Sequence, residues 1–416
     1  MSDSIQPAPL ADRRIPRGND WLSRAQLDAI TPRELVKRAT ALKPLLAANS
    51  REAERLRRPV DEAWDALRAS GIFYHFVPKI YGGLEFDIDT YIDAMMPLGE
   101  GCSSTGWVAS FCVEHNWMLA HFSKQAQDET FGGGFPYIIA PGVTFPPGIM
   151  TAVEGGYRVT GRWKWGTGVM HADWVLASAI LPNGSRPRIY FILVPAEQVD
   201  VIDTWHVDGM IGTGSNDIAM QDVFVPAHRV IDMKEMQDGT APGCRMHSNP
   251  IYRMPMLPFL CVAAAIPAVG TARQAVKTYR DRLTSRVTIG MQSTQAERPA
   301  AQMRLARAQV LTSTAETIIR QAAREIVGLA ERAEPAKVEE RIELRCRIAY
   351  AVKFAREAIQ TLVEAAGAGA HMLDDPLQRA FRDINMMSCH VVYDLDTALE
   401  LHGRAMLGLP PNSVLV

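Results

Sequence analysis

Four consecutive residues in the middle of the chain could hold a flat heterocycle with polar edges. They are Trp165, Gly166, Thr167 and Gly168, within the segment 161–174, G-R-W-K-W-G-T-G-V-M-H-A-D-W. The indole offers an aromatic face, the hydroxyl a hydrogen-bond partner, and the two glycines free backbone amides. Short β-type runs flank the segment, which predicts a strand, a loop and a second strand. The residue types alone favour a simpler interpretation, a β-hairpin whose tryptophans belong to the core.

Composition and charge narrow the class of protein. The chain has 416 residues, 47% of them hydrophobic, which is ordinary for a globular protein of two or three packed units. A net charge of -2 gives no reason to expect nucleic acid or an anionic membrane as partner. The six cysteines lack C-x-x-C spacing, so we expect neither a metal site nor disulfides, and a cytoplasmic location. No signal-peptide segment and no run of about 18 apolar residues is found, so we expect no membrane span.

The N-terminal third is predicted to be helical. We expect a loose arm over residues 1–30 and a helical domain over 31–136. Thr31 and Glu34 have the spacing of a capping box, with proline at the first helical position, which predicts a helix start. Further helices are predicted at 60–70, 88–99, 103–122 and 123–131.

The pattern changes near residue 137 and again near residue 233. Between these points, short β-rich runs broken by Gly and Pro predict a small β-barrel or sandwich domain over 137–232. The predicted strands are 137–141, 148–153, 157–165, 174–181, 188–195, 199–207 and 218–226. Beyond them, apolar residues recur at helical spacing, which predicts an antiparallel four-helix bundle domain over 233–416. Its predicted helices are 256–287, 297–332, 337–367 and 376–407.

The domain order and the central loop together resemble a known fold. A helical domain, a β domain and a four-helix bundle is the order of the acyl-CoA dehydrogenase fold, and the register G-R-W-x-W-x-T-G-x-x-x-A-D-W is similar to its middle-domain segment. The resemblance implies an α+β, mainly α architecture. It also implies that Trp165 packs on a flavin ring and that Thr167 bonds near flavin N5, with Gly166 and Gly168 beside the cofactor. The relatives mostly carry serine where this chain has Thr167.

Two further segments resemble one branch of that family. Gly209–Asp217 and Asp222–Arg229 look like the reduced-flavin-dependent monooxygenases. Most dehydrogenases of the fold carry a Glu before Gly-Thr as the base near the start of the final helix, and the matching region here, Asp383–Asp394, has no Glu-Gly-Thr. His390 stands there instead, and His115 matches a second histidine of the monooxygenase branch. The alternative for each is a structural histidine, hydrogen-bonded within a helix contact.

The resemblance implies a reaction and a role for each residue. The chain would be the oxygenase component of a two-component flavin monooxygenase, with O2 as co-substrate and a separate NAD(P)H:flavin reductase as partner. It would hydroxylate a small aromatic or heteroaromatic substrate, phenol- or indole-like, through a flavin C4a-hydroperoxide. Thr167 would hold the N5 proton, and His115 would support oxygen activation. His390 would accept a proton from the substrate, for which a pKa near neutrality is suitable.

Cofactor form, pocket walls and assembly are further expectations. Arg286–Gly290 departs from the spacing with which the family's dehydrogenases hold FAD, so reduced FMN is favoured over FADH2. Four side chains could wall a flat apolar substrate, although each is more often plain core: Phe111, Trp117, Met118 and Met386. Members of the fold bury their bundle helices between subunits, which implies a homotetramer. The alternatives are an acyl-CoA dehydrogenase-type oxidoreductase, an S- or N-oxygenating relative, and an inactive member that serves as a subunit or binding protein.

Overall fold

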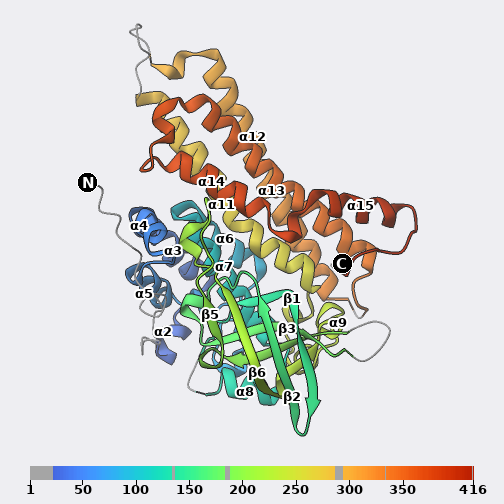
Figure 1. Ribbon diagram of the computed structural model, residues 1–416. Helices are drawn as coiled ribbons and strands as arrows, with labels where there is room; N and C mark the ends of the chain where they lie inside the picture. The colour runs from blue at the N-terminus through green and yellow to red at the C-terminus, as the bar shows by residue number, and fades with distance from the viewer. Residues whose placement is uncertain (1–21, 134–135, 183–187, 286–293, 333, 415) are drawn as a thin grey trace.

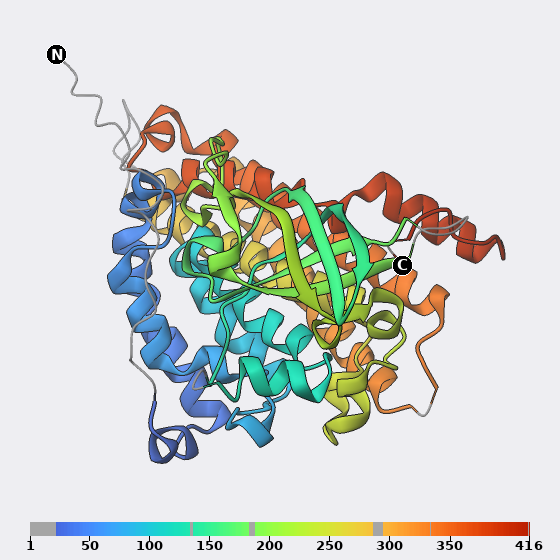
Figure 2. The same ribbon diagram turned by 60° about the horizontal axis from the view of Figure 1, so that its bottom comes forward.

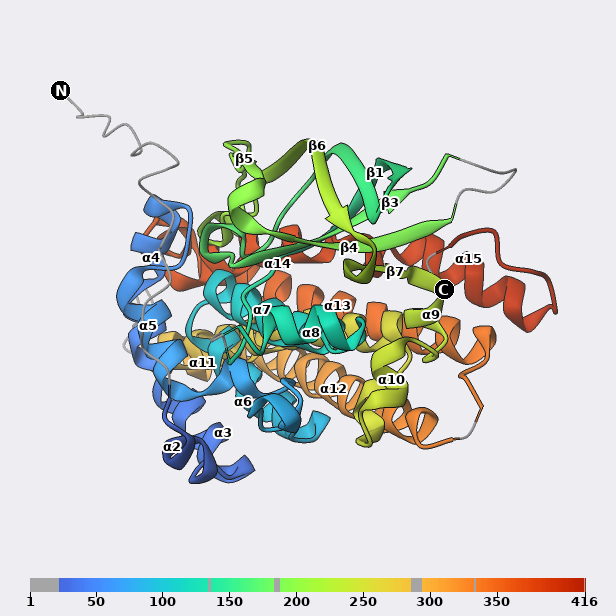
Figure 3. The same ribbon diagram turned by 90° about the horizontal axis from the view of Figure 1, so that it is seen from below.

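The computed structural model describes residues 22–133, 136–182, 188–285, 294–332, 334–414 and 416. N-terminal helices come first, then one β-sheet, then long C-terminal helices (Figure 1). The predicted class, α+β and mainly α, is therefore confirmed. Figure 3 shows the sheet lying over one side of the helical body, directly above α7 and α14.

The N-terminal helices begin and end largely where their capping residues predict. They are α2 Arg24–Asp28, α3 Pro32–Ala41, α4 Lys43–Leu56, α5 Asp61–Ser70, α6 Ile88–Gly101, α7 Ser103–Leu119 and α8 Lys124–Thr130. The Thr31 hydroxyl accepts the Glu34 amide of α3 at 3.2 Å. The described part of the expected loose arm, 22–30, contains the capped helix α2, and its residues Leu27 and Ile30 are buried in the main core. Burial of these two side chains ties this stretch to the body.

The seven strands form one sheet. They are β1 Gly142–Val153, β2 Gly156–Trp163, β3 Trp174–Ile180, β4 Ile189–Pro195, β5 Asp200–Ile202, β6 Asp217–Pro226 and β7 Val230–Asp232. Their order is β5-β6-β2-β1-β3-β4-β7, in which only β1 and β3 pair in parallel. The predicted strand 137–141 is not a strand, and β7 was not predicted.

The sheet curls around a core of its own without closing its edges. Val175 and Ala177 of β3 face this inner core, while Leu176 between them faces the helices, as alternation along a strand requires. Trp163 also belongs to the inner core, and its indole donates to the Ser178 carbonyl at 2.7 Å. In the described residues, β5 and β7 remain edge strands, so the expected barrel is an open one (Figure 2).

The C-terminal part consists of long helices, but the fourth predicted helix is broken. The helices are α9 Met233–Gln237, α10 Pro242–Met246, α11 Met256–Ser285, α12 Pro299–Ala330, α13 Val338–Ala366, α14 Pro376–Ser388 and α15 Leu395–Met406. A short 3-10 turn, Val391–Tyr393, separates α14 from α15. The prediction of one continuous helix over 376–407 was therefore wrong.

Two buried side chains hold this break in place. The guanidinium of Arg345 on α13 donates to the carbonyls of Val391 and Val392, at 3.0 and 3.1 Å. The Tyr393 hydroxyl donates to the Cys261 carbonyl of α11 at 2.8 Å. These contacts give hydrogen-bond partners to the buried carbonyl groups of the break and to the buried Tyr393 hydroxyl. One helix can therefore end and the next begin at this point.

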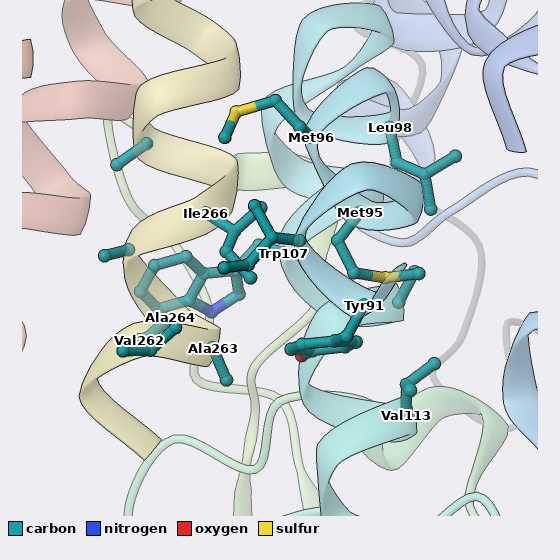
Figure 4. Packing of buried hydrophobic residues seen from close by; sticks show 14 of the residues in the cluster. Tyr91, Met95, Met96, Leu98, Trp107, Val113, Val262, Ala263, Ala264 and Ile266 are labelled. Carbon is teal, nitrogen blue, oxygen red and sulfur yellow. The ribbon is translucent and has the colours of Figure 1, made fainter. Parts of the chain in front are cut away.

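Helix α11 lies at the centre of the helical body. Its side chains pack against α6 and α7, where Figure 4 shows Trp107 of α7 close to Ala264 and Ile266. By length and composition α11 could cross a membrane, but 89% of its most apolar window is buried inside the protein. The apolar character of α11 is therefore explained by its central position.

Candidate active site

One face of α7 carries three rings at helical spacing. Trp107, Phe111 and His115 follow one another every four residues, which places them side by side on the helix surface. The ring centroids of Trp107 and Phe111 are 4.8 Å apart, and those of Phe111 and His115 are 5.7 Å apart. Phe111 is the one residue of α7 that is not fully buried. The row of rings is therefore reachable at Phe111.

The break after α14 brings His390 to the same row. Its imidazole lies 5.7 Å from the Trp107 ring and 6.0 Å from the Phe111 ring, edge to face in both cases. Phe111 thus contacts both histidines that the sequence singled out, although 275 positions separate them along the chain (390 − 115). Both histidines therefore border the same aromatic ring, which makes them candidates for one site.

The proton position on His115 follows from its partner. Its Nδ1 lies 2.5 Å from the Ala140 carbonyl oxygen, which can only accept, so Nδ1 carries the hydrogen. Burial lowers the pKa of His115 to about 4, which keeps the ring neutral at pH 7. Its Nε2 is then an acceptor, directed toward Gly142, where a Cβ atom would stand only 2.7 Å away.

His390 is in the opposite tautomer. It is partly buried, and its Nδ1 accepts the Val392 amide in a long contact of 3.5 Å, which leaves the hydrogen on Nε2. Burial lowers the pKa of His390 to about 4 as well. The near-neutral pKa expected for a proton acceptor is therefore not found, because desolvation penalises the charged ring.

Sequence reasoning missed the residue beside His115. Glu114 is fully buried, and its Oε1 lies 3.8 Å from His115 Nε2. Burial raises its pKa well above the usual value, and its Oε2 has no partner among the described residues. A carboxyl group in an otherwise apolar helix was the signal that could have identified it.

The loop after β2 has the conformation of a strained surface site. Trp165 has a φ of +69° and is 61% exposed, which is unusual for a large aromatic residue. Such a backbone costs on the order of 1–3 kcal/mol and is found where structure around it fixes a functional group. Trp163 is a core residue, as the β-hairpin interpretation expects for both tryptophans. Trp165 instead exposes its ring.

The two glycines of the loop serve different purposes. Gly168 has a φ of +91°, and a Cβ there would stand 2.9 Å from Cys112 Sγ of α7, so only glycine lets the loop approach that helix. The Gly166 amide donates to the Asn216 carbonyl at 2.8 Å and is not free for a ligand. The loop is thus fastened to α7 on one side and to the 211–216 segment on the other.

Thr167 stands at the edge of the protein interior with its hydroxyl engaged. Its Oγ1 lies 2.9 Å from Ser215 Oγ, and the residue as a whole is 9% exposed. An outward indole, a buried hydroxyl next to it and two neutral imidazoles suit a flat ring system with N–H and carbonyl edges. Reduced flavin fits these residues: Trp165 and Thr167 would hold its ring, and bound flavin supplies the electrons that activate O2.

Other expected features lie elsewhere. Trp117 is a core residue, since its indole donates to the Ile251 carbonyl at 2.6 Å, and Met118 is buried. Met386 is partly buried at the core boundary, and residues 286–290 lie outside the described part of the chain. Two cavities, of about 50 and 290 Å³, have linings that include none of the site residues above. Among the described residues no cluster of three metal-ligating side chains occurs.

Models of one protein family match both helical parts of the chain. The acyl-CoA dehydrogenase N-terminal domain matches residues 30–134, and the acyl-CoA dehydrogenase C-terminal domain matches residues 262–395. These two ranges contain both histidines and all of α7.

Individual relatives are similar over nearly the whole chain. A pigment production hydroxylase from a Rhodococcus species is 38% identical over 93% of this chain and 100% of its own length. The oxygenase component of an FADH2-dependent resorcinol hydroxylase from a Rhizobium species is 34% identical, over 91% of this chain and 95% of its own. Among solved structures, XiaF from a Streptomyces species, in complex with FADH2 and glycerol, has a TM-score of 0.84 at 30% identity, covering 94% of this chain and 98% of its own.

Proposed function

The chain belongs to the acyl-CoA dehydrogenase family, within its flavin-dependent monooxygenases, and from this we propose that it hydroxylates a small phenol- or indole-like compound. It acts as the oxygenase component of a two-component system and uses reduced flavin. The observation that carries the proposal is the contact of Phe111 with both His115 and His390. That contact joins an apolar ring surface to two neutral imidazoles.

The substrate class is inferred from the row of rings on α7. A flat aromatic molecule at Phe111 would contact the faces and edges of Phe111 and Trp107, which favour offset or edge-to-face packing with another ring. The two imidazoles supply polar contacts for a hydroxyl or N–H group at the edge of such a molecule. The relatives named above for resorcinol and for pigment production agree with this class.

The two tautomers give the histidines different roles, one as a hydrogen-bond acceptor and one as a donor. We infer that His115 Nε2 accepts the substrate's O–H or N–H hydrogen, which raises the electron density of the ring to be hydroxylated. His390 Nε2–H donates and orients the opposite edge of the substrate or the oxygen being transferred. This assignment differs from the first expectation, in which His390 accepted the proton, because the Val392 amide occupies the acceptor nitrogen of His390.

The loop residues are proposed to bind the flavin ring. Trp165 packs against it, Gly168 lets the loop lie close to α7, and the Thr167 oxygen accepts the N5–H. For the flavin form, the relatives named for FADH2 favour FAD, whereas the earlier argument for FMN rests on residues 286–290, outside the described residues. We therefore propose that FADH2 is accepted.

The remaining partners follow from the two-component arrangement. We propose a separate NAD(P)H:flavin reductase as the source of reduced flavin, a cytoplasmic location, and a homotetramer. Support for the tetramer comes from apolar side chains exposed on the two helices that project from the body in Figure 1, α12 and α15. They are Met303 and Val310 on α12, and Leu399 and Met406 on α15.

An anaerobic titration followed by oxygen mixing tests the function. The protein is titrated with FADH2 and, separately, FMNH2, then mixed with O2 and a panel of phenols and indoles, and product, oxygen and peroxide are measured. A monooxygenase forms hydroxylated product in proportion to the reduced flavin added. Reduction of bound oxidised flavin by an acyl-CoA would instead identify a dehydrogenase, and no flavin binding at all would identify an inactive member.

A further inference from the structure

Three hydroxyl groups run in series from the flavin-facing loop into the interior. Thr167 Oγ1 lies 2.9 Å from Ser215 Oγ, which lies 2.9 Å from Thr213 Oγ1. Thr213 Oγ1 in turn lies 3.0 Å from the carbonyl oxygen of Met210. Ser215 and Thr213 are fully buried, so water does not compete for these contacts.

The last member of the series decides the direction of all the others. The Met210 carbonyl can only accept, so the Thr213 hydrogen points to it. A hydroxyl has one hydrogen, so Ser215 must donate to Thr213, and Thr167 must then donate to Ser215. Any reversed link would leave two lone pairs facing each other at about 3 Å inside the protein, at the cost of a buried hydrogen bond. Thr167 therefore keeps only acceptor capacity toward the surface.

The terminal carbonyl is held firmly. It also accepts the Trp205 indole N–H at 3.0 Å and the Thr213 backbone N–H at 3.1 Å. The Met210 amide donates to Asp383 Oδ1 at 2.6 Å, from α14, and Met210 has a φ of +54°. Hydrogen bonds on both sides of Met210 therefore fix the residue that presents this carbonyl to Thr213.

We propose that Ser215 and Thr213 are positioning residues that make this protein prefer reduced over oxidised flavin. The inference rests on the proposed function, in which Thr167 meets flavin N5. Reduced flavin carries a hydrogen on N5, which an acceptor satisfies. Oxidised flavin has only a lone pair there, and a hydroxyl that cannot donate leaves that lone pair without a partner. We call Thr167, Ser215 and Thr213 the relay. It turns the Thr167 hydroxyl, which could otherwise donate or accept, into an acceptor that favours reduced flavin.

The test compares the dissociation constants of both redox forms in the same variant. Ser215→Ala removes the acceptor for Thr167, and its hydroxyl can then turn and donate to oxidised N5. We expect oxidised flavin to bind about 10-fold more tightly, which corresponds to about 1.4 kcal/mol, with little change for reduced flavin. The midpoint potential of bound flavin should fall by about 30 mV. Loss of the fold would instead weaken the binding of both redox forms.

Two further variants and one control complete the design. Thr213→Val should act in the same direction, because Ser215 can then donate to Thr167, and it also serves if Ser215→Ala does not fold. Ser215→Thr keeps the hydroxyl and should restore the wild-type ratio of the two dissociation constants. The matched control is Thr312→Val, which deletes an equally buried hydroxyl bonded within α12, 2.8 Å from the Ala308 carbonyl.

The outcomes separate this inference from the proposed function. Wild-type protein that binds neither redox form would sink the function itself. Wild-type protein that binds reduced flavin, with an unchanged ratio in both Ser215→Ala and Thr213→Val, would overturn the relay alone. A wild-type ratio near one would also overturn it. If Thr312→Val also changed the ratio of the two dissociation constants, the change would follow from losing any buried hydroxyl and the relay would be overturned.

Discussion

The Nδ1 hydrogen of His115 is donated to the carbonyl oxygen of Ala140, 2.5 Å away in the segment that leads into β1. This contact fixes both the ring plane and the tautomer, so a residue of α7 is oriented by the segment that leads into β1. The catalytic role proposed for His115 therefore depends on how the two parts of the chain dock.

His115→Asn keeps a donor in place of Nδ1, which orients the ring, and removes Nε2, the proposed proton acceptor. The Asn amide can still donate toward Ala140 but offers nothing at the position of Nε2. We expect nearly wild-type thermal stability and a hydroxylation rate roughly 10²–10⁴-fold lower, if Nε2 is a true proton acceptor. Product formed per reduced flavin and a thermal unfolding curve are the two measurements. A variant that hydroxylates at the wild-type rate would leave His115 with a structural role only.

His390→Ala should uncouple oxygen consumption from hydroxylation. The variant loses the Nε2–H donor beside Phe111 but keeps Thr167 and its loop, so it should still consume oxygen with reduced flavin and release more peroxide. We expect a product rate lower by roughly 10²–10⁴-fold. Cys389→Ser, at the exposed neighbouring position, is the control and should resemble wild type. Equal losses in the two variants would point to a disturbed break between α14 and α15.

Thr167→Val should bind flavin less selectively and leak peroxide. A buried N–H donor left without an acceptor costs about 1–3 kcal/mol, and valine has nearly the shape of threonine. Thr167→Ser keeps the oxygen and should retain most of the coupling between oxygen use and product. The ratio of peroxide to product, measured with one phenol for all three proteins, checks the order. The same ratio in Thr167→Val and wild type would remove Thr167 from the site.

The stability of the flavin-free protein should fall as pH drops from about 6.5 to about 4. Burial lowers the pKa of four histidines to about 4, so the unfolded state binds protons first and unfolding becomes easier in acid. They are His75, His115, His121 and His390. Each contributes a slope of up to about 1.4 kcal/mol per pH unit in this interval.

Two buried carboxyl groups oppose that trend. Burial raises the pKa of Asp383 to about 6 and that of Glu114 well above its usual value, so their contribution is lost as pH rises. Burial also lowers the pKa of His171 and His247, so six histidines oppose two carboxyl groups and the net slope remains positive. Urea unfolding at several pH values between 4 and 7 provides the measurement. A flat profile, or one that falls with pH, would contradict the burial assigned to these histidines.

Charged substitutions on α15 should dissociate the proposed tetramer. Met406 is 76% exposed and follows the partly exposed Leu399, so Met406→Glu places a carboxylate in any interface formed by this helix. Sedimentation at micromolar concentration should show a tetramer for wild type and smaller species for the variant. Ile80→Glu, at an exposed apolar side chain of the N-terminal part, is the control. A monomeric wild type would refute the assembly.

Much of the fold could be predicted because its signals are local. Thr31 and Gly71 mark helix ends with their own side chain or backbone, and the change from helical to β-type spacing near residue 137 is visible in the sequence. The break at His390 was missed because its causes are distant: Arg345 and Tyr393 anchor it through α13 and α11. A helical pattern cannot reveal which carbonyls a remote arginine will satisfy.

The sequence named candidate residues for the site but not their protonation states. His115, His390 and Thr167 were identified by resemblance, and Phe111 was expected at the pocket wall. Their protonation states were not, since a tautomer depends on partners such as the Ala140 carbonyl that only the folded chain supplies. Similarly, the partner of Thr167 lies 48 positions away in the sequence. Glu114 was not predicted because its carboxyl group is unusual only when its burial is known.

Adjacent residues of helix α7 contact the proposed flavin loop and the proposed substrate site. Cys112 meets Gly168 of the loop, and Phe111, its neighbour, meets His390. Directed evolution toward bulkier substrates would therefore meet epistasis here: enlarging the space at Phe111 shifts the helix on which the flavin loop rests. Libraries that vary Phe111 and Cys112 together should recover efficient variants that single-site libraries cannot reach.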